Sequence, residues 1–92
     1  MTAGRVRRRV VVAGRVQQVG FRASCHRRAV EAGVGGFVRN RPDGTVEAEF
    51  EGPVPSVDAL VTWCRSGPPA ARVTAVTVAD LAVVGDDRFA VR

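Results

Sequence analysis

The sequence predicts an α+β fold in which two helices cover one face of an antiparallel sheet. Three observations support this prediction: valines alternate with arginines near the start, two later stretches carry apolar residues at helical spacing, and a Pro-Asp-Gly turn separates two further strand-like stretches. The chain has 92 residues, of which 46% are hydrophobic. This size and composition suit one domain with a single core, spanning residues 1–92.

The first strand is expected over residues 6–13, where apolar and charged residues alternate. Arg7 and Arg9 occupy the face opposite to a row of three valines, Val6, Val10 and Val12. A strand with this pattern buries one side against a core and leaves the other side to solvent. The charged face is therefore expected to remain open to water.

Apolar residues then repeat at the spacing of a helix, at Phe21, Cys25, Ala29 and Ala32. Gly33 follows directly, and glycine commonly ends a helix because it accepts left-handed backbone. The first helix is thus expected to begin near Phe21 and to end at Gly33.

Two strands are expected next, at Gly36–Asn40 and Thr45–Phe50. Between them stands Arg41-Pro42-Asp43-Gly44, in which proline and glycine fit the second and fourth positions of a type I turn. The two strands are therefore expected to form an antiparallel hairpin.

A second helix is indicated by apolar residues at i, i+3, i+4 and i+7, namely Val57, Leu60, Val61 and Cys64. It is expected to have Pro55 or Ser56 near its start, to carry Asp58 in its first turn, and to end at the Gly-Pro-Pro sequence of residues 67–69. Strand-like residues return over 72–84, and a turn at 85–87 precedes a short last strand at 88–92. This order is the split β-α-β arrangement of the ferredoxin-like fold, which hosts many unrelated functions.

The net charge is +5, and all 14 basic residues are arginine. Such a surplus attracts small anions and equally favours weak, non-specific contact with nucleic acid. No apolar stretch approaches the roughly 18–20 residues needed to cross a bilayer. The apolar residues after Arg9 are too few for a signal peptide, so we expect a mature, cytoplasmic start.

A candidate anion-binding site follows the first strand. Residues 14–22 read GRVQQVGFR, so a strand breaks into a loop that passes into a helix carrying Arg22 in its first turn. Helix N-termini present unpaired N–H groups and the positive end of the helix dipole, and both favour an anion. Arg22 has the wrong sign for that end unless a ligand supplies negative charge, and its planar fork of donors matches two phosphate oxygens. The alternative is that Arg22 is one surface arginine among many.

Cys25 and Cys64 lie in separate expected helices, without the C-x-x-C spacing of a zinc or redox centre. We expect both to be small core residues, and a bridge between the two helices is left open. His26 is expected to be exposed. The neighbours Ser24, Cys25 and His26 point in different directions on a helix and therefore cannot form a nucleophilic triad.

Five short motifs are spread along the chain: VQQVGFR at residues 16–22, GFVRN at 36–40, DGTVE at 43–47, Glu51-Gly52 and GPPA at 67–70. In their order and spacing the chain resembles the acylphosphatase family over nearly its whole length. The predicted split β-α-β order is also the family's fold.

The resemblance implies hydrolysis of the mixed anhydride of a carboxylate and phosphate, with a small acyl phosphate as substrate and inorganic phosphate as product. It implies no cofactor, no metal ion and no covalent intermediate. In the family, the arginine matching Arg22 binds the phosphate oxygens, and the asparagine matching Asn40 holds the attacking water. Backbone N–H groups of a loop surround the phosphate, and the corresponding residues here are Arg15, Val16, Gln17, Gln18, Val19 and Gly20. Taken alone, Asn40 is equally typical of an ordinary hairpin turn.

Gln18 departs from the family, which usually has glycine at this point of the loop. Glycine tolerates positive φ and close approach of a ligand. A left-handed Gln18 would cost on the order of 1–2 kcal/mol, which predicts weaker binding or activity rather than its loss. Phe37 also replaces the more usual tryptophan or tyrosine, and as a core aromatic it is expected to be tolerated.

Three other functions compete with this interpretation. A non-catalytic, regulatory phosphate- or anion-binding domain would share the site, and Gln18 keeps that alternative open. An RNA-binding module shares the architecture, but Gly35 and Asn40 stand where its stacking aromatics belong, so no specific nucleic-acid binding is expected. A larger hydrogenase-maturation protein would need zinc-finger cysteine pairs, which this sequence lacks. We therefore expect a free-standing, monomeric, cytoplasmic enzyme that does not associate with membranes.

Overall fold

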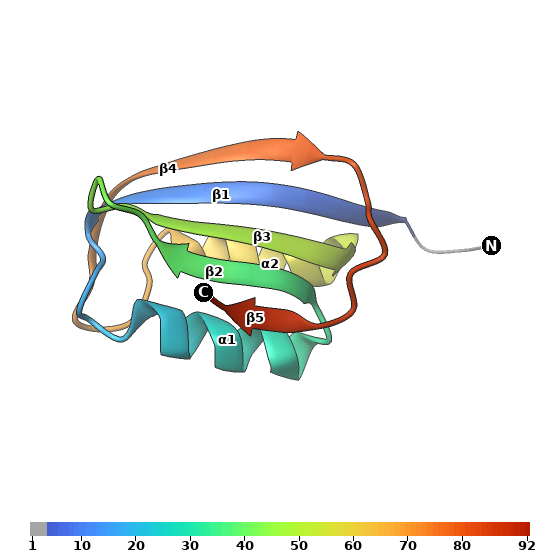
Figure 1. Ribbon diagram of the computed structural model, residues 1–92, viewed down its shortest axis with the longest axis horizontal. Helices are drawn as coiled ribbons and strands as arrows, with labels where there is room; N and C mark the ends of the chain where they lie inside the picture. Colours follow the sequence, from blue (N-terminus) through green and yellow to red (C-terminus); the bar gives the residue numbers. More distant parts are fainter. Residues whose placement is uncertain (1–3) are drawn as a thin grey trace.

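The computed structural model describes residues 4–92, which form a five-stranded sheet with two helices on one of its faces (Figure 1). In chain order the elements are β1 (Arg5–Arg15), α1 (Phe21–Ala32), β2 (Gly35–Asn40), β3 (Val46–Pro53), α2 (Val54–Cys64), β4 (Arg72–Leu81) and β5 (Phe89–Val91). The predicted split β-α-β order is confirmed, with the short last strand added at one edge. No helix among these residues is both long and apolar enough to cross a membrane.

The strand order in the sheet is β4-β1-β3-β2-β5. The four longer strands pair antiparallel, as predicted: β1 with both β3 and β4, and β2 with β3. β5 instead pairs parallel with β2, so the sheet as a whole is mixed. The cause is the connection from β4, which crosses the end of the sheet to the opposite edge (Figure 1). Because β4 and β2 run in opposite directions, a strand that starts where β4 finishes runs the same way as β2.

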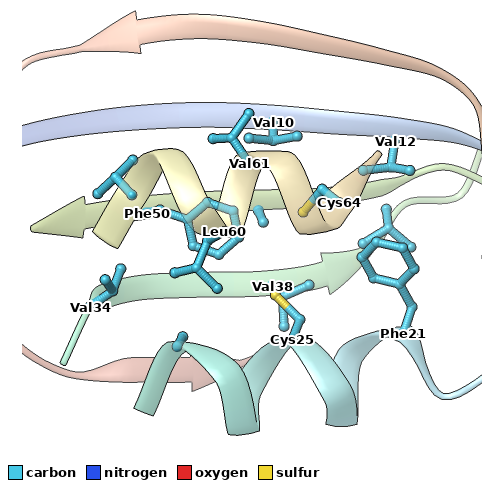
Figure 2. Close-up of a cluster of buried hydrophobic side chains, with 14 of the residues drawn as sticks. Val10, Val12, Phe21, Cys25, Val34, Val38, Phe50, Leu60, Val61 and Cys64 are labelled. Atoms are coloured by element: carbon cyan, nitrogen blue, oxygen red, sulfur yellow. The ribbon is translucent and has the colours of Figure 1, made fainter. Parts of the chain in front are cut away.

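The hydrophobic core lies between the sheet and the two helices (Figure 2). The helices contribute the apolar positions that their spacing predicts: Phe21, Cys25 and Ala29 from α1, and Val57, Leu60, Val61 and Cys64 from α2. Ala32, predicted on the same stripe, is exposed because α1 ends there. Both thiols are buried and free, as predicted for core residues. Burial raises the pKa of both, that of Cys64 to about 12, so neither is a reactive thiolate.

The opposite face of the sheet carries charged side chains, but part of it is closed to water, contrary to the prediction. Arg7 is only 7% exposed and Glu51 is fully buried. Arg7 donates hydrogen bonds to Glu49 at 2.8 Å and to Glu51 at 3.0 Å. The Glu51 carboxylate also accepts three backbone N–H groups from residues 84–86, which connect β4 to β5. The connection that makes the sheet mixed thus also buries one end of its charged face.

A second ion-pair group continues along the same face. Arg9 and Arg39, from β1 and β2, both donate to the carboxylate of Glu47 on β3, at 2.6 and 2.5 Å. Burial alone would raise the pKa of Glu47, but the two arginines outweigh this effect and hold it below its ordinary value. We call Arg7, Arg9, Arg39, Glu47, Glu49 and Glu51 together the sheet network.

Helix α2 begins at Val54, with Pro55 near its start as predicted, and ends at Cys64, ahead of the Gly-Pro-Pro sequence. Asp58 therefore lies beyond the first turn, and its carboxylate pairs with Arg8 of β1 instead of with the helix N-terminus. Proline near the start supplies a preformed helical φ, so no side-chain cap is required. Asp58 thus forms an ion pair between helix and sheet and does not lie in the first turn as predicted.

Candidate active site

The loop between β1 and α1 contains two residues with left-handed backbone. Gln18 has a φ of 61°, and Gly20, which caps the start of α1, has a φ of 80°. Within residues 4–92, Gln18 is the one non-glycine residue with positive φ. Glycine adopts this conformation freely because it has no Cβ, whereas Gln18 bears a cost on the order of 1–2 kcal/mol. The conditional prediction of a strained Gln18 is thus confirmed.

This loop leaves a series of backbone donors without partners. Across the part of the chain that the structure describes, no protein acceptor is found for the backbone N–H groups from Gln17 to Ala23, which cover the loop and the first turn of α1. Gly20 offers no side chain to cap the helix, and the positive end of the helix dipole lies at the same point. Free N–H groups in this arrangement are well suited to an anion.

A cavity of about 200 Å³ lies beside these donors. One continuous segment, residues 16–23, forms most of its lining, and Asn40 at the end of β2 contributes from a separate strand. β1 and β2 run in the same direction on either side of β3, so their carboxyl ends meet at one end of the sheet. This topology brings Asn40 to the loop despite their separation in sequence.

Arg22 lines the cavity from the first turn of α1. Its Nη1 donates a hydrogen bond to the backbone oxygen of Arg92 at 3.1 Å, while no salt bridge to Arg22 occurs within residues 4–92. The backbone N–H of Arg92 donates a hydrogen bond to the backbone oxygen of Val38 at 2.9 Å. The guanidinium carbon of Arg92 lies 4.2 Å from the centre of the Phe37 ring. Arg22 is therefore oriented by one contact with a backbone oxygen, and the rest of its five N–H donors are available to a ligand.

Gln17 fastens the loop to the hairpin turn that follows Asn40. Its side-chain amide donates to the backbone oxygens of Arg41 at 2.8 Å and Thr45 at 3.0 Å. Asp43 adds order to the same turn by accepting hydrogen bonds from the backbone N–H and the hydroxyl of Thr45. The Gln17 side chain thus connects the loop before α1 to the turn that follows Asn40.

The lining contains no histidine, cysteine, aspartate or glutamate. The polar groups of the lining residues are backbone N–H groups, the guanidinium of Arg22 and the amides of Gln18 and Asn40. Such a site suits chemistry that needs an anion held and a neutral nucleophile oriented, without a side-chain base that changes protonation near neutral pH.

Comparison with known proteins identifies the family. A family model described as Acylphosphatase matches residues 8–91. The chain is 54% identical over 82 residues to an acylphosphatase from Synechococcus sp. (strain CC9605), covering 89% of this chain and 99% of the relative. It is 58% identical over 77 residues to an acylphosphatase from Methylococcus capsulatus, covering 84% of each. The crystal structure of acylphosphatase from Bacillus subtilis superposes with a TM-score of 0.90 at 35% identity, covering 95% of this chain and 98% of that one.

The chain belongs to the acylphosphatase family. It is thus related to enzymes that act on small acyl phosphates, as the sequence motifs predict. Of the residues that the resemblance to acylphosphatases singles out, Val16, Gln18, Gly20, Arg22 and Asn40 line the cavity.

The remaining three loop residues contribute differently. Gln17 points its amide at the hairpin turn, Val19 packs partly buried against the core, and Arg15 lies opposite Arg72 of β4 at the same end of the sheet. Sequence reasoning missed the anchoring role of Gln17 and the contact of Arg22 with the last residue. Neither has a local signal, because both depend on which segments the topology brings together.

Proposed function

We propose that this chain hydrolyses the carboxyl-phosphate anhydride of acyl phosphates without a metal ion or a covalent intermediate, using Arg22, Asn40 and the loop N–H groups. The observation that carries the proposal is the row of free N–H groups beside Arg22, facing Asn40 across one cavity. Water attacks phosphorus, the bond between phosphorus and the acyl oxygen breaks, and the carboxylate leaves with the electron pair. Both protons of the water remain with the released phosphate.

The phosphoryl group would be held by the N–H groups of residues 17–23 together with Arg22. Phosphoryl transfer spreads negative charge over the three non-bridging oxygens, so donors fixed around them stabilise the transition state. The Arg92 carbonyl holds Arg22 in place before the ligand binds, and a preorganised donor loses little entropy when it engages. The leaving carboxylate is already stable, so a strong general acid is unnecessary.

Asn40 would orient the attacking water. Its amide both donates and accepts, so it can fix a water in line with the leaving oxygen without changing its own protonation state. It lines the cavity from β2, whereas the phosphate donors come from the segment 16–23. Binding is thus assigned to the loop and the first turn of α1 and water positioning to β2, so separate variants can test them.

A non-catalytic phosphate-binding domain is the alternative that Gln18 supports. Its left-handed backbone stands where the family usually has glycine, and Gln18 is one of the residues that line the cavity. A binding domain would retain phosphate through Arg22 and would not turn over an acyl phosphate. The sparse aromatic content, at 5%, gives an RNA-binding interpretation no comparable support.

The test is hydrolysis of benzoyl phosphate in EDTA by the parent protein and by the variants Arg22→Ala and Asn40→Ala. We expect turnover by the parent, loss of about 1,000-fold or more in kcat/KM together with weaker phosphate inhibition in Arg22→Ala, and loss of kcat with phosphate inhibition retained in Asn40→Ala. Arg88→Ala serves as a matched control, because Arg88 is an exposed arginine that does not line this cavity. Full activity in Arg22→Ala would remove the central assignment, and phosphate binding without turnover in the parent would favour the binding domain.

We further propose that the enzyme acts as a monomer in the cytoplasm. Two free, buried thiols suit a reducing compartment, where disulfides are rare. Sedimentation of the purified protein and fractionation of cells test the two parts, and a stable dimer or an exported protein would contradict them.

A further inference from the structure

A second groove lies next to the phosphate cavity. It has a volume of about 310 Å³ and runs between Ser24, Arg27 and Arg28 of α1 on one side and Trp63 with the loop of residues 66–69 on the other. Its polar groups are therefore two guanidinium groups and the hydroxyls of two serines, and it contains no acidic side chain. The groove offers donors to an anion and an aromatic wall to an apolar chain.

Phe21 forms the partition between the two spaces. Its side chain belongs to the lining of the phosphate cavity, and its ring centre lies 5.1 Å from that of Trp63 in the groove. The loop on the far side approaches so closely that a Cβ at Gly67 would come within 2.8 Å of the Phe21 ring. The two spaces therefore adjoin across Phe21 and the first turn of α1.

Arg27 lies at the junction. It is four residues after Ala23, which lines the phosphate cavity, so the two share one face of α1. Side chains on a helix lean toward its N-terminus, so Arg27 lies over the turn that carries Ala23. Arg27 is exposed and forms no salt bridge within residues 4–92. Arg28 instead stacks on Trp63, with its guanidinium carbon 5.2 Å from the ring centre.

The geometry of the reaction indicates where the acyl group goes. In an in-line displacement the attacking and leaving oxygens lie on opposite sides of phosphorus. The proposed water site is at Asn40 on β2, so the acyl oxygen must point away from Asn40, and the other lining residues belong to the segment 16–23. The groove adjoins that segment at Phe21 and takes no lining residue from β2.

We propose that this groove is the subsite for the acyl group and that Arg27 selects acyl groups carrying a second negative charge, such as a carboxylate. The inference rests on the proposed hydrolysis of acyl phosphates. Arg27 is a specificity-determining residue in this assignment, because it contacts the part of the substrate that does not react. An unpaired guanidinium one turn from the reacting centre is within reach of a carboxylate two or three carbons from the carbonyl.

The test compares succinyl phosphate with butyryl phosphate, which have acyl chains of the same length and differ in the terminal carboxylate. We expect the parent protein to prefer succinyl phosphate, and Arg27→Gln to lower the ratio of kcat/KM for succinyl to butyryl phosphate about tenfold, mainly through KM. Arg88→Gln removes the same charge at a site outside both spaces and should leave the ratio unaltered.

Three results would overturn the subsite. An unaltered ratio in Arg27→Gln would show that Arg27 does not meet the acyl group. An equal loss for both substrates would place Arg27 in phosphate binding or in folding, and an equal effect of Arg88→Gln would show long-range attraction rather than contact. If the parent hydrolysed neither substrate, the proposed function itself would fail. If it hydrolysed both, but with no preference that depends on Arg27, only the subsite would fail.

Discussion

The sheet network and the loop at residues 15–20 use arginine in opposite ways. In the sheet network, Arg7 is buried and held by two carboxylates, and each buried polar side chain that the structure describes has a hydrogen-bond partner. Beside the loop, Arg22 is exposed and its one contact is with a backbone oxygen, backbone N–H groups are unpaired, and Gln18 is strained. The difference shows that stabilising interactions are concentrated at one place and binding capacity at another.

The same division holds for the charges as a whole. Within residues 4–92, six of the arginines form salt bridges, and all of these lie in β1, in β2 or in the hairpin turn that follows it. The unpaired arginines are Arg15, Arg22, Arg27, Arg28, Arg65, Arg72, Arg88 and Arg92. Most of these lie in α1 or at the end of the molecule that carries the cavity, so the net positive charge is concentrated there. Such a field raises the local concentration of anionic substrate.

The sharpest way to separate the two regions is to remove the buried arginine. Arg7→Leu leaves Glu51 buried without its nearest charge partner, and breaking a buried pair in this way costs about 3 kcal/mol or more of unfolding free energy. Urea denaturation measures the loss. The kcat/KM of the folded fraction should stay at the parent value, because Arg7 lies outside the phosphate cavity.

Arg5→Leu is the matched control for this change. The Arg5 side chain is 43% exposed, and its nitrogen lies 4.0 Å from the Glu51 carboxylate, so its loss should cost less than about 1 kcal/mol. Equal destabilisation by the two variants would mean that burial of Arg7 does not strengthen its contribution to the unfolding free energy. The sheet network would then not be the stabilising region that the comparison assumes.

The sequence predicted some features of the fold and the site and missed others, and the difference lies in whether a feature depends on local or on distant residues. Features set by local periodicity were predicted well, such as the apolar stripes of both helices and the glycine at the end of α1. Features that need distant segments were missed: the parallel pairing of β5, the burial of Glu51 by residues 84–86, and the amide of Gln17 on the hairpin turn. Arginine illustrates the limit: the sequence marks Arg22 as a candidate ligand-binding residue, but nothing in it shows that Arg7 is paired with Glu49 and Glu51.

The second prediction concerns how the loop is held in register with Asn40. Gln17→Ala removes the two hydrogen bonds to Arg41 and Thr45, so the wall that carries Asn40 should shift relative to the loop. We expect kcat to fall about tenfold, about 1.4 kcal/mol of transition-state stabilisation, with the phosphate inhibition constant nearly unaltered.

Gln17→Glu refines the same experiment. It keeps the size of the side chain but replaces both amide donors by carboxylate oxygens, which cannot donate to the two carbonyl groups. Its kcat should fall at least as far as that of Gln17→Ala. A full rate in Gln17→Glu would show that Gln17 fills space rather than positions Asn40.

The smallest expected effect isolates the strain at Gln18. Gln18→Gly removes the Cβ that penalises a φ of 61°, a gain of about 1–2 kcal/mol that is partly offset by about 0.4–1 kcal/mol because glycine makes the unfolded chain more flexible. We expect a net stabilisation of about 0.5–1 kcal/mol and unchanged or faster turnover. Gln18→Ala removes the same side-chain amide but keeps the strained backbone, so it should not be stabilised. If both variants lost activity equally, the amide of Gln18 would itself contact the phosphate, and the strain would then be the consequence of aiming that amide into the cavity.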